Sequence, residues 1–529
     1  MELSDKNNSV TLEEYQLSKD KNIFEEVIDR MMLESFTPEF SAKIMNMPLK
    51  DKRMSILSLL DKDRNLFLRI KGLINSGIGK YDHIKDVILM LREYVKVGEV
   101  EKKKFGEVMT PLELVREMLA TLPEEVWSNP NLKWLDPANG TGPYPLMVIY
   151  KLMNGLKSCK GLEDDEIRYK HIVENMIYVC ELQPKNMFLY MCAVDPWDIY
   201  HLNIYTGSFL DEKFDKHMKE VWGIEKFDIV IGNPPYQEEV EGGSQKPLYD
   251  KFILKSIDFS EKVLFVTPSR WFCGGKGLDS FRRKMMSRTD IRLINHFDNA
   301  SKIFGNGVFI TGGVNYFLID KDYFGDVSLN GQNVNINKFD IIVNNTISYK
   351  LIEKMSIYNS IETICKGQSY SGITTNDKRL FDKKLNDNYI KCYVSKRNGY
   401  EKWIDINQIN KFLDIKKWKV ILVEATNAID SGHGKYFSFG NKFIGRPNEI
   451  CNQSYILFEV DTEIEANSLL SYLNCKLVDY LVSLRKISQH TKPDTCKWVP
   501  IVPFDRQWTD DQLFEYFNLT EEEKKLILS

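Results

Sequence analysis

Four consecutive residues carry groups that can activate an aromatic amine: Asn233, Pro234, Pro235 and Tyr236, directly after the apolar run FDIVIG. Each proline fixes φ and lacks an N–H, so the carbonyl groups around it stay out of helices and sheet ladders. Asn233 adds a side-chain acceptor, and Tyr236 adds a flat ring. Two acceptors beside a ring suit the exocyclic amine of adenine or cytosine. Hydrogen bonds from that amine to Asn233 and to the Pro234 carbonyl would release its conjugated lone pair for attack on a sulfonium methyl group.

A base that stacks on Tyr236 must first leave the duplex. Flipping a base out costs a few kcal/mol, and stacking on an aromatic side chain contributes about 1–3 kcal/mol per base. An ordinary proline turn is the alternative for an isolated NPPY sequence. The neighbouring motifs therefore decide between the two.

Two further segments, each after an apolar run, suit a nucleoside cofactor. In LDPANGTGPYP, Asp136 can accept from an ammonium group, while Gly140 and Gly142 allow a tight turn close to a ligand. This turn lacks the lysine of a phosphate-binding loop. In IYVCELQP, Glu181 ends an apolar run, the position at which an acidic residue commonly holds ribose hydroxyls. A solvated surface glutamate is the alternative at that position.

Apolar runs alternate with helical stretches between residues 105 and 320. Six of these runs are predicted strands: LKWLDPA, MIYVCEL, FDIVIGN, KVLFVTP, IRLINHF and VNYFLID. This alternation predicts βαβ units in a doubly wound α/β sheet, which binds ligands beyond the carboxyl ends of its strands. Apolar residues at helical spacing predict a helical region over residues 1–104. The less regular sequence over residues 345–529 predicts a separate α+β module.

Composition limits the class of protein. The chain has 529 residues, a net charge of −4, nine cysteines and seven histidines. Its charge neither supports nor excludes nucleic acid, because a basic cleft can lie in an acidic body. No CxxC or HxxxH spacing indicates a zinc site or a disulfide framework. A polar N-terminus and the lack of an apolar run of about 18 residues predict a soluble cytoplasmic protein that makes no membrane contact.

The motifs together resemble a known family. In order, FGEVMTP, LDPANGTG, IYVCELQP, TGSFLD, FDIVIGNPPYQ, KVLFVTPSRW and FGNGVFITGGVNYFLID are similar to the motif series of S-adenosylmethionine-dependent DNA adenine-N6 methyltransferases of the gamma arrangement. The large single-chain methylases of type II restriction–modification systems and phages show the nearest likeness. The resemblance implies a Rossmann-like methyltransferase domain over 105–344 and a target recognition domain over 345–529. It also implies methyl transfer from S-adenosylmethionine to a flipped-out adenine in double-stranded DNA, without a metal.

The resemblance further implies roles for individual residues. Glu181 would hold the cofactor ribose, and Phe209 would stack on the cofactor adenine. The family places an acidic residue at the position of Ser208, so Ser208, Asp211 or a backbone group would accept from the adenine amine here. The methionine end of the cofactor would be contacted by Thr110, Pro111, Asp136, Gly140 and Gly142.

Other residues would contact the DNA. Phe304 matches the aromatic residue that packs on the far side of the flipped base, with Phe309 as a substitute and a core phenylalanine as the alternative. Phosphates and base edges would be contacted by basic residues that lie among aromatic residues in the C-terminal module, and solvated surface charges are the alternative. These candidates are Arg397, Arg446, Arg485 and Lys486.

Four other functions compete with this one. Glutamine methylases also carry NPPY, but they lack a large C-terminal module; RNA adenine is a further acceptor that stays open. A binding protein of this fold, acting as a specificity subunit or decoy, would need no intact NPPY. A restriction–methylation fusion needs a nuclease cluster, and KPDTCK lacks its second acidic residue. We expect a monomer at the nucleoid that reads an asymmetric site; the recognition sequence and a cognate restriction nuclease stay open.

Overall fold

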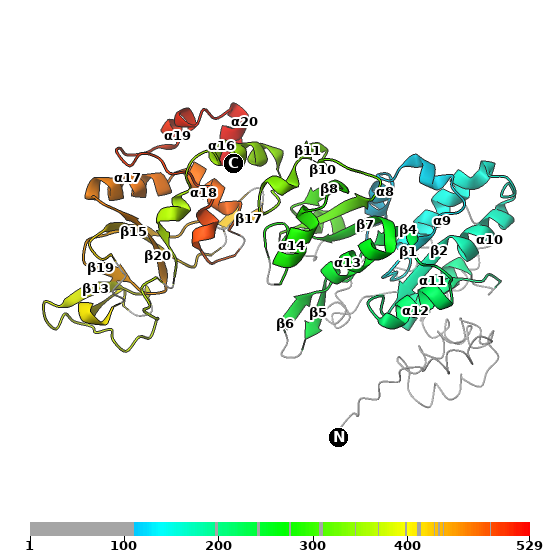
Figure 1. The fold of residues 1–529 in the computed structure, drawn as a ribbon, viewed down its shortest axis with the longest axis horizontal. Coiled ribbons are helices and arrows are strands. Elements are labelled where there is room, and N and C mark those ends of the chain that lie inside the picture. Colours follow the sequence, from blue (N-terminus) through cyan, green and yellow to red (C-terminus); the bar gives the residue numbers. More distant parts are fainter. Residues whose placement is uncertain are drawn as a thin grey trace, which may run out of the picture. The chain divides into compact units, whose positions relative to one another are not determined.

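The computed structural model describes residues 110–529, apart from 196–198, 241–243, 275–276, 306–309, 311, 344, 369, 397–398, 410–413, 428, 432–433, 437 and 487. The chain forms two compact units (Figure 1). The first ends at Ser269 and resumes over Arg283–Asn333, and the second comprises Arg270–Arg282 and Val334–Ser529. The predicted border between residues 344 and 345 lies inside the second unit, and the predicted N-terminal helical region lies outside the described residues.

A nine-stranded sheet of order β11-β10-β8-β9-β7-β4-β1-β2-β3 organises the first unit. The neighbours from β7 to β3 pair in parallel, whereas β9 runs antiparallel to both β7 and β8. The predicted α/β class is confirmed, and each of the six predicted runs contains a strand or lies within one. The strands are β1 (Trp134–Asp136), β2 (Ile177–Glu181), β3 (Asn203–Thr206), β4 (Phe227–Gly232), β7 (Ser260–Pro268), β8 (Ile291–Phe297), β9 (Val314–Asp320), β10 (Val327–Leu329) and β11 (Gln332–Val334).

Helices connect the parallel strands, because a parallel pair needs a crossover. A hairpin of β5 (Gln237–Val240) and β6 (Ser244–Pro247) follows the NPPY residues. The helices of the sheet region are α8 (Leu112–Leu119), α9 (Pro143–Gly155), α10 (Asp165–Asn175), α11 (Pro184–Val194), α12 (Glu212–Glu220), α13 (Tyr249–Phe259), α14 (Asp279–Met286) and α15 (Ala300–Phe304).

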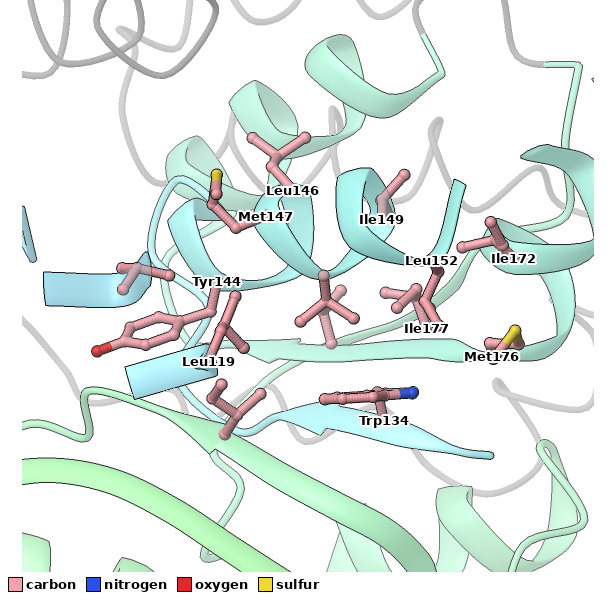
Figure 2. Packing of buried hydrophobic residues seen from close by; sticks show 14 of the residues in the cluster. Leu119, Trp134, Tyr144, Leu146, Met147, Ile149, Leu152, Ile172, Met176 and Ile177 are labelled. Carbon is pink, nitrogen blue, oxygen red and sulfur yellow. The ribbon is translucent and has the colours of Figure 1, made fainter. Parts of the chain in front are cut away.

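The core of the first unit fixes the ends of the strands. Helix α9 starts at Pro143, directly after Gly142, whose φ of 88° ends the preceding turn; proline suits this position because its missing N–H would have no helical partner. Figure 2 shows Leu152 of this helix in one layer with Trp134 and Ile177 from β1 and β2. All three side chains are buried, so the turn between β1 and α9 has a rigid base.

The second unit contains a four-stranded sheet of order β12-β20-β15-β18 and a three-stranded sheet of order β14-β13-β19, together with helices. This composition confirms the α+β prediction for the C-terminal part. The strands are β12 (Cys365–Lys366), β13 (Tyr389–Tyr393), β14 (Glu401–Asp405), β15 (Trp418–Val423), β16 (Ile429–Ser431), β17 (Gly434–Tyr436), β18 (Lys442–Gly445), β19 (Glu449–Cys451) and β20 (Tyr455–Val460). The helices are α16 (Thr346–Met355), α17 (Glu463–Leu473), α18 (Lys476–Ser483), α19 (Asp510–Tyr516) and α20 (Glu521–Leu528). Among the described residues, no helix has the length and apolar character needed to cross a membrane.

Candidate active site

The point at which the strand order reverses lies between β1 and β4. From β1 the chain order continues outward through β2 and β3, whereas β4 is followed by β7 on the opposite side. Ligands of open α/β sheets bind at such a point, beyond the carboxyl ends of the strands. Asp136 is the last residue of β1, and Asn233 directly follows the last residue of β4. Two of the predicted site segments therefore meet at this edge.

The NPPY segment is held on both sides. The Asn233 amide donates from Nδ2 to Thr110 Oγ1 at 3.0 Å, and the Tyr236 carbonyl accepts from the Leu248 N–H at 3.2 Å. Gly232 is required before it, because a Cβ there would lie 2.8 Å from Asp136 Oδ1. Tyr236 is 8% exposed, and burial raises the pKa of its phenol far above the ordinary value. The side chain is thus a neutral aromatic surface at physiological pH.

Asp136 is a buried carboxyl whose two oxygens differ in hydrogen bonding. Its Oδ1 accepts from the Ala138 N–H at 3.1 Å, but no donor among the described residues reaches Oδ2. Burial raises the pKa of this carboxyl, and the nearby Glu181 carboxylate raises it further. A buried carboxylate without a partner is costly, so the site favours a cationic ligand group at Oδ2.

The glycine turn after β1 is braced by Glu181. Its two carboxylate oxygens accept from the N–H groups of Gly140 at 2.7 Å and Gln183 at 2.8 Å. Gly142 leaves no room for a side chain, since a Cβ would lie 2.4 Å from the Tyr190 ring. Glu181 is 6% exposed, so its first role is to fix the turn. Its predicted hold on ribose hydroxyls stays a prediction.

The segment after β3 carries Phe209, whose ring is buried among other aromatic rings. Phe209 is 1% exposed, and its ring centroid lies 5.0 Å from Phe214 and 5.4 Å from Phe252. Ser208 Oγ accepts from the Leu210 N–H at 3.2 Å, so this side chain shapes the turn. The identity of the acceptor for the cofactor amine, which is Ser208, Asp211 or a backbone group, stays a prediction.

The sequence reasoning missed Tyr144, which lies beside the NPPY segment. Its ring is buried and its hydroxyl donates to Met118 Sδ at 3.5 Å, while the Thr110 side chain hydrogen-bonds to the same hydroxyl. Figure 2 shows this hydroxyl at the outer end of the ring, away from the aliphatic side chains of α9. The sequence GTGPYP indicates such a position, because a tyrosine follows the glycine turn.

A second missed feature is a polar junction at the base of the segment that carries Phe304. Ser269 Oγ lies 2.8 Å from His296 Nδ1, and His296 Nε2 lies 2.9 Å from Asp298 Oδ1. Asn315 donates to Ser269 Oγ at 3.1 Å. These contacts join β7, β8 and β9 at the edge that carries the candidate site.

Phe304 itself is partly buried and packs against the core of the first unit. Its predicted contact with a flipped base is therefore limited to the part of the ring that stays exposed, and it stays a prediction. Its substitute, Phe309, lies outside the described residues.

The basic candidates of the second unit differ in their surroundings. The guanidinium of Arg485 pairs with both oxygens of Asp340 at 2.8 Å, donates to the Asp494 carbonyl and lies 4.7 Å from the Trp498 ring centroid. Lys486 is 1% exposed, and its ammonium donates to Thr426 Oγ1 at 2.6 Å and to the Ser438 carbonyl at 2.7 Å.

Two of the predicted DNA contacts fall on residues that are already hydrogen-bonded within the unit. Lys486 is buried and Arg485 is partly buried, and their contacts with DNA stay predictions. Arg446 is exposed at the end of β18 and remains a candidate, and Arg397 lies outside the described residues.

Comparison with known proteins finds similarity to methylases over part of the chain. Residues 197–304 match the family of Eco57I restriction-modification methylases, and this segment contains the NPPY residues and ends at Phe304. The predicted resemblance to DNA methylases is confirmed. An uncharacterized adenine-specific methylase of Mycoplasma pneumoniae is 27% identical to this chain, in an alignment that covers 49% of the chain and 80% of the relative.

Solved structures give weaker likenesses. The modification subunit of a type I restriction enzyme from Vibrio vulnificus is 17% identical with a TM-score of 0.35, over 46% of this chain and 50% of that one. The type ISP restriction-modification enzyme LlaGI, solved as a nuclease-deletion mutant with a DNA substrate mimic, is 12% identical with a TM-score of 0.45, over 92% of this chain and 53% of that one. The chain thus spans about half the length of both proteins.

Proposed function

We propose that this chain is a site-specific DNA methyltransferase that transfers a methyl group from S-adenosylmethionine to the N6 amine of adenine in double-stranded DNA. The observation that carries this proposal is the meeting of two sites at one reversal of strand order. The amine acceptors Asn233 and Pro234 follow β4, and the unsatisfied buried carboxyl of Asp136 ends the adjacent strand β1. The family match over residues 197–304 and the adenine-specific relative support the reaction and the base.

The residues beside this edge fit S-adenosylmethionine. Asp136 Oδ2 suits the ammonium of its methionine part, with Thr110 and Pro111 near the same end. Gly140 has a φ of 56° and no atom within 4 Å of a Cβ position, so the space beside its Cα is open to a ligand. Ribose hydroxyls would go to Glu181, and the adenine would lie near Ser208 and Phe209. When bound, S-adenosylmethionine supplies an electrophilic methyl group on a positively charged sulfur.

Asn233 and Pro234 prepare the acceptor. Their carbonyl oxygens accept from the two N–H bonds of the adenine amine, which draws the nitrogen toward tetrahedral geometry and frees its lone pair. The neutral ring of Tyr236 stacks on the flipped base, and Phe304 contacts it from the other side. The chain supplies orientation and hydrogen bonds to the reacting amine, which is how positioning lowers a barrier.

The second unit is the proposed target recognition domain. Arg446 and Arg397 are the basic candidates that we favour for phosphate or base contacts. We expect the chain to act as a cytoplasmic monomer on duplex DNA.

The substrate class can be tested by transfer of a labelled methyl group. Purified protein is incubated with tritiated S-adenosylmethionine and, in separate reactions, unmethylated duplex DNA, total RNA or a peptide release factor. We expect label in duplex DNA only. Label confined to RNA or to the protein factor contradicts the proposed substrate, and a lack of label in all three contradicts the proposed enzyme.

A further inference from the structure

A directional chain of hydrogen bonds leads from the core to the catalytic amide. The Tyr144 hydroxyl donates to Met118 Sδ at 3.5 Å, and it is hydrogen-bonded to the Thr110 side chain. Thr110 Oγ1 in turn accepts from Asn233 Nδ2 at 3.0 Å. Thr110 is 3% exposed and Tyr144 is 2% exposed. Water therefore has little access to either hydroxyl.

The order of donors in this chain determines which end of the Asn233 amide faces Thr110. A hydroxyl has one proton to donate. Tyr144 donates to Met118 Sδ, and the hydrogen bond with Thr110 lowers the pKa of the Tyr144 phenol, which is the effect of a proton donated by Thr110. Thr110 Oγ1 then has only lone pairs left for Asn233, and only the NH₂ end of an amide can occupy that place. The NH₂ end of Asn233 therefore faces the Thr110 hydroxyl, and its carbonyl oxygen points the opposite way in the amide plane.

We infer that Thr110 is a positioning residue for methyl transfer: its hydroxyl fixes the Asn233 amide so that the carbonyl oxygen meets the incoming exocyclic amine. This role rests on the proposed function and differs from the contact with the cofactor that the family resemblance implies. An amide turned by 180° would present N–H groups to an N–H donor and would repel the substrate. The residue thus acts on the chemical step through Asn233.

The test separates the chemical step from cofactor binding. Thr110→Val keeps the shape of the side chain and removes the hydroxyl, whereas Thr110→Ser keeps the hydroxyl. We expect the single-turnover rate of methyl transfer to duplex DNA to fall by about 10–100-fold in Thr110→Val, because small errors of orientation have effects of that size. Thr110→Ser should stay near the wild-type rate, and in Thr110→Val the dissociation constant of S-adenosylmethionine, measured by calorimetry without DNA, should change by much less than the rate.

Two further variants complete the design. Thr121→Val is the matched control, because Thr121 lies just after α8 and donates to the Met118 carbonyl at 2.7 Å without contacting Asn233; it should transfer at the wild-type rate. Tyr144→Phe removes the hydroxyl that orients Thr110, and it should lose rate to an extent between those of Thr110→Ser and Thr110→Val. It also serves if Thr110→Val does not fold.

The outcomes are distinct. A full-rate Thr110→Val, or a loss of rate matched by an equal loss of cofactor affinity, overturns the positioning role and leaves the proposed function intact. Wild-type protein that transfers no methyl group to DNA contradicts the proposed function, and this inference fails with it.

Discussion

Asp136 in the first unit and Arg485 and Lys486 in the second differ in how their charged groups are satisfied. Asp136 is 2% exposed, and one of its carboxylate oxygens has no donor among the described residues. Lys486 is buried and the Arg485 side chain is 7% exposed, but hydrogen bonds from within the second unit satisfy both. A satisfied buried charge contributes to structure, whereas an unsatisfied one marks a place where a ligand supplies the missing partner.

The same contrast appears in the pKa directions. Burial raises the pKa of Asp136, so the ligand-free site disfavours the carboxylate. The Arg485 guanidinium and Lys497 hold the pKa of Asp340 well below its ordinary value, against the opposing effect of burial. Asp340 is therefore a permanent carboxylate, and Asp136 becomes one when a cation binds.

Asp136→Asn should give the largest effect in this comparison. Removing one partner of a buried ion pair costs about 2–5 kcal/mol in binding, so the affinity for S-adenosylmethionine should fall by at least about 30-fold. Calorimetric titration of both proteins measures it. Unchanged affinity would show that Oδ2 does not face the cofactor ammonium.

Without cofactor, Asp136→Asn should be more stable than the wild type. Above the ordinary value of 3.8 and up to its raised folded value, Asp136 binds more protons in the folded state than in the unfolded state, so the wild type loses stability as pH rises through this window. Asp136→Asn lacks this loss. Its melting temperature without cofactor should exceed that of the wild type by a margin that grows from pH 4 to pH 7, and a constant or shrinking margin would contradict the raised pKa.

Arg485→Met tests the satisfied side of the comparison. Loss of its charged hydrogen bonds should lower the free energy of unfolding by about 1–2 kcal/mol, at the low end for such bonds because Asp340 is half-exposed and partly screened. Urea unfolding measures the change. Arg506→Met is the control, since Arg506 and its partner Asp505 are both exposed, and it should leave stability unchanged.

Substituting an exposed basic residue should weaken DNA binding, and substituting a buried one should not. This is the smallest of the expected effects. Arg446→Ala should reduce the slope of log affinity against log salt concentration by about one, if Arg446 contacts a phosphate. Lys486→Met should leave DNA affinity unchanged, since burial lowers the pKa of this ammonium to about 8 and keeps it from the surface. Fluorescence anisotropy with a labelled duplex measures both; weaker binding by Lys486→Met alone would reverse the assignment.

Local sequence predicted the strand ends well, because the features that define them are local. The apolar run before Asn233 and the glycines after Asp136 each fix a strand and the turn that follows it. The antiparallel direction of β9 was not predicted, since a run such as VNYFLID has the same pattern in either direction. Strand β9 follows β8 through a connection that starts and ends at the same edge of the sheet, so the two strands run in opposite directions.

Long-range partners explain the features that the local sequence did not predict. Arg485 pairs with Asp340, and Lys486 donates to Thr426 and Ser438. Each partner is distant in the sequence from the basic residue that it binds. A basic residue among aromatic residues therefore looks the same whether it is buried or exposed. Tyr144 was missed for a related reason, because its contact with Thr110 depends on the packing of α8 against α9.

The most direct test of the account is the identity of the methylated base and its dependence on Asn233. Unmethylated duplex DNA is incubated with S-adenosylmethionine and either wild-type protein or Asn233→Ala, digested to nucleosides and analysed by mass spectrometry. The account predicts N6-methyladenine as the product of the wild type, with a rate that falls by at least about 100-fold in the variant. Methylcytosine as the product, or an Asn233→Ala protein that methylates adenine at the wild-type rate, would contradict it.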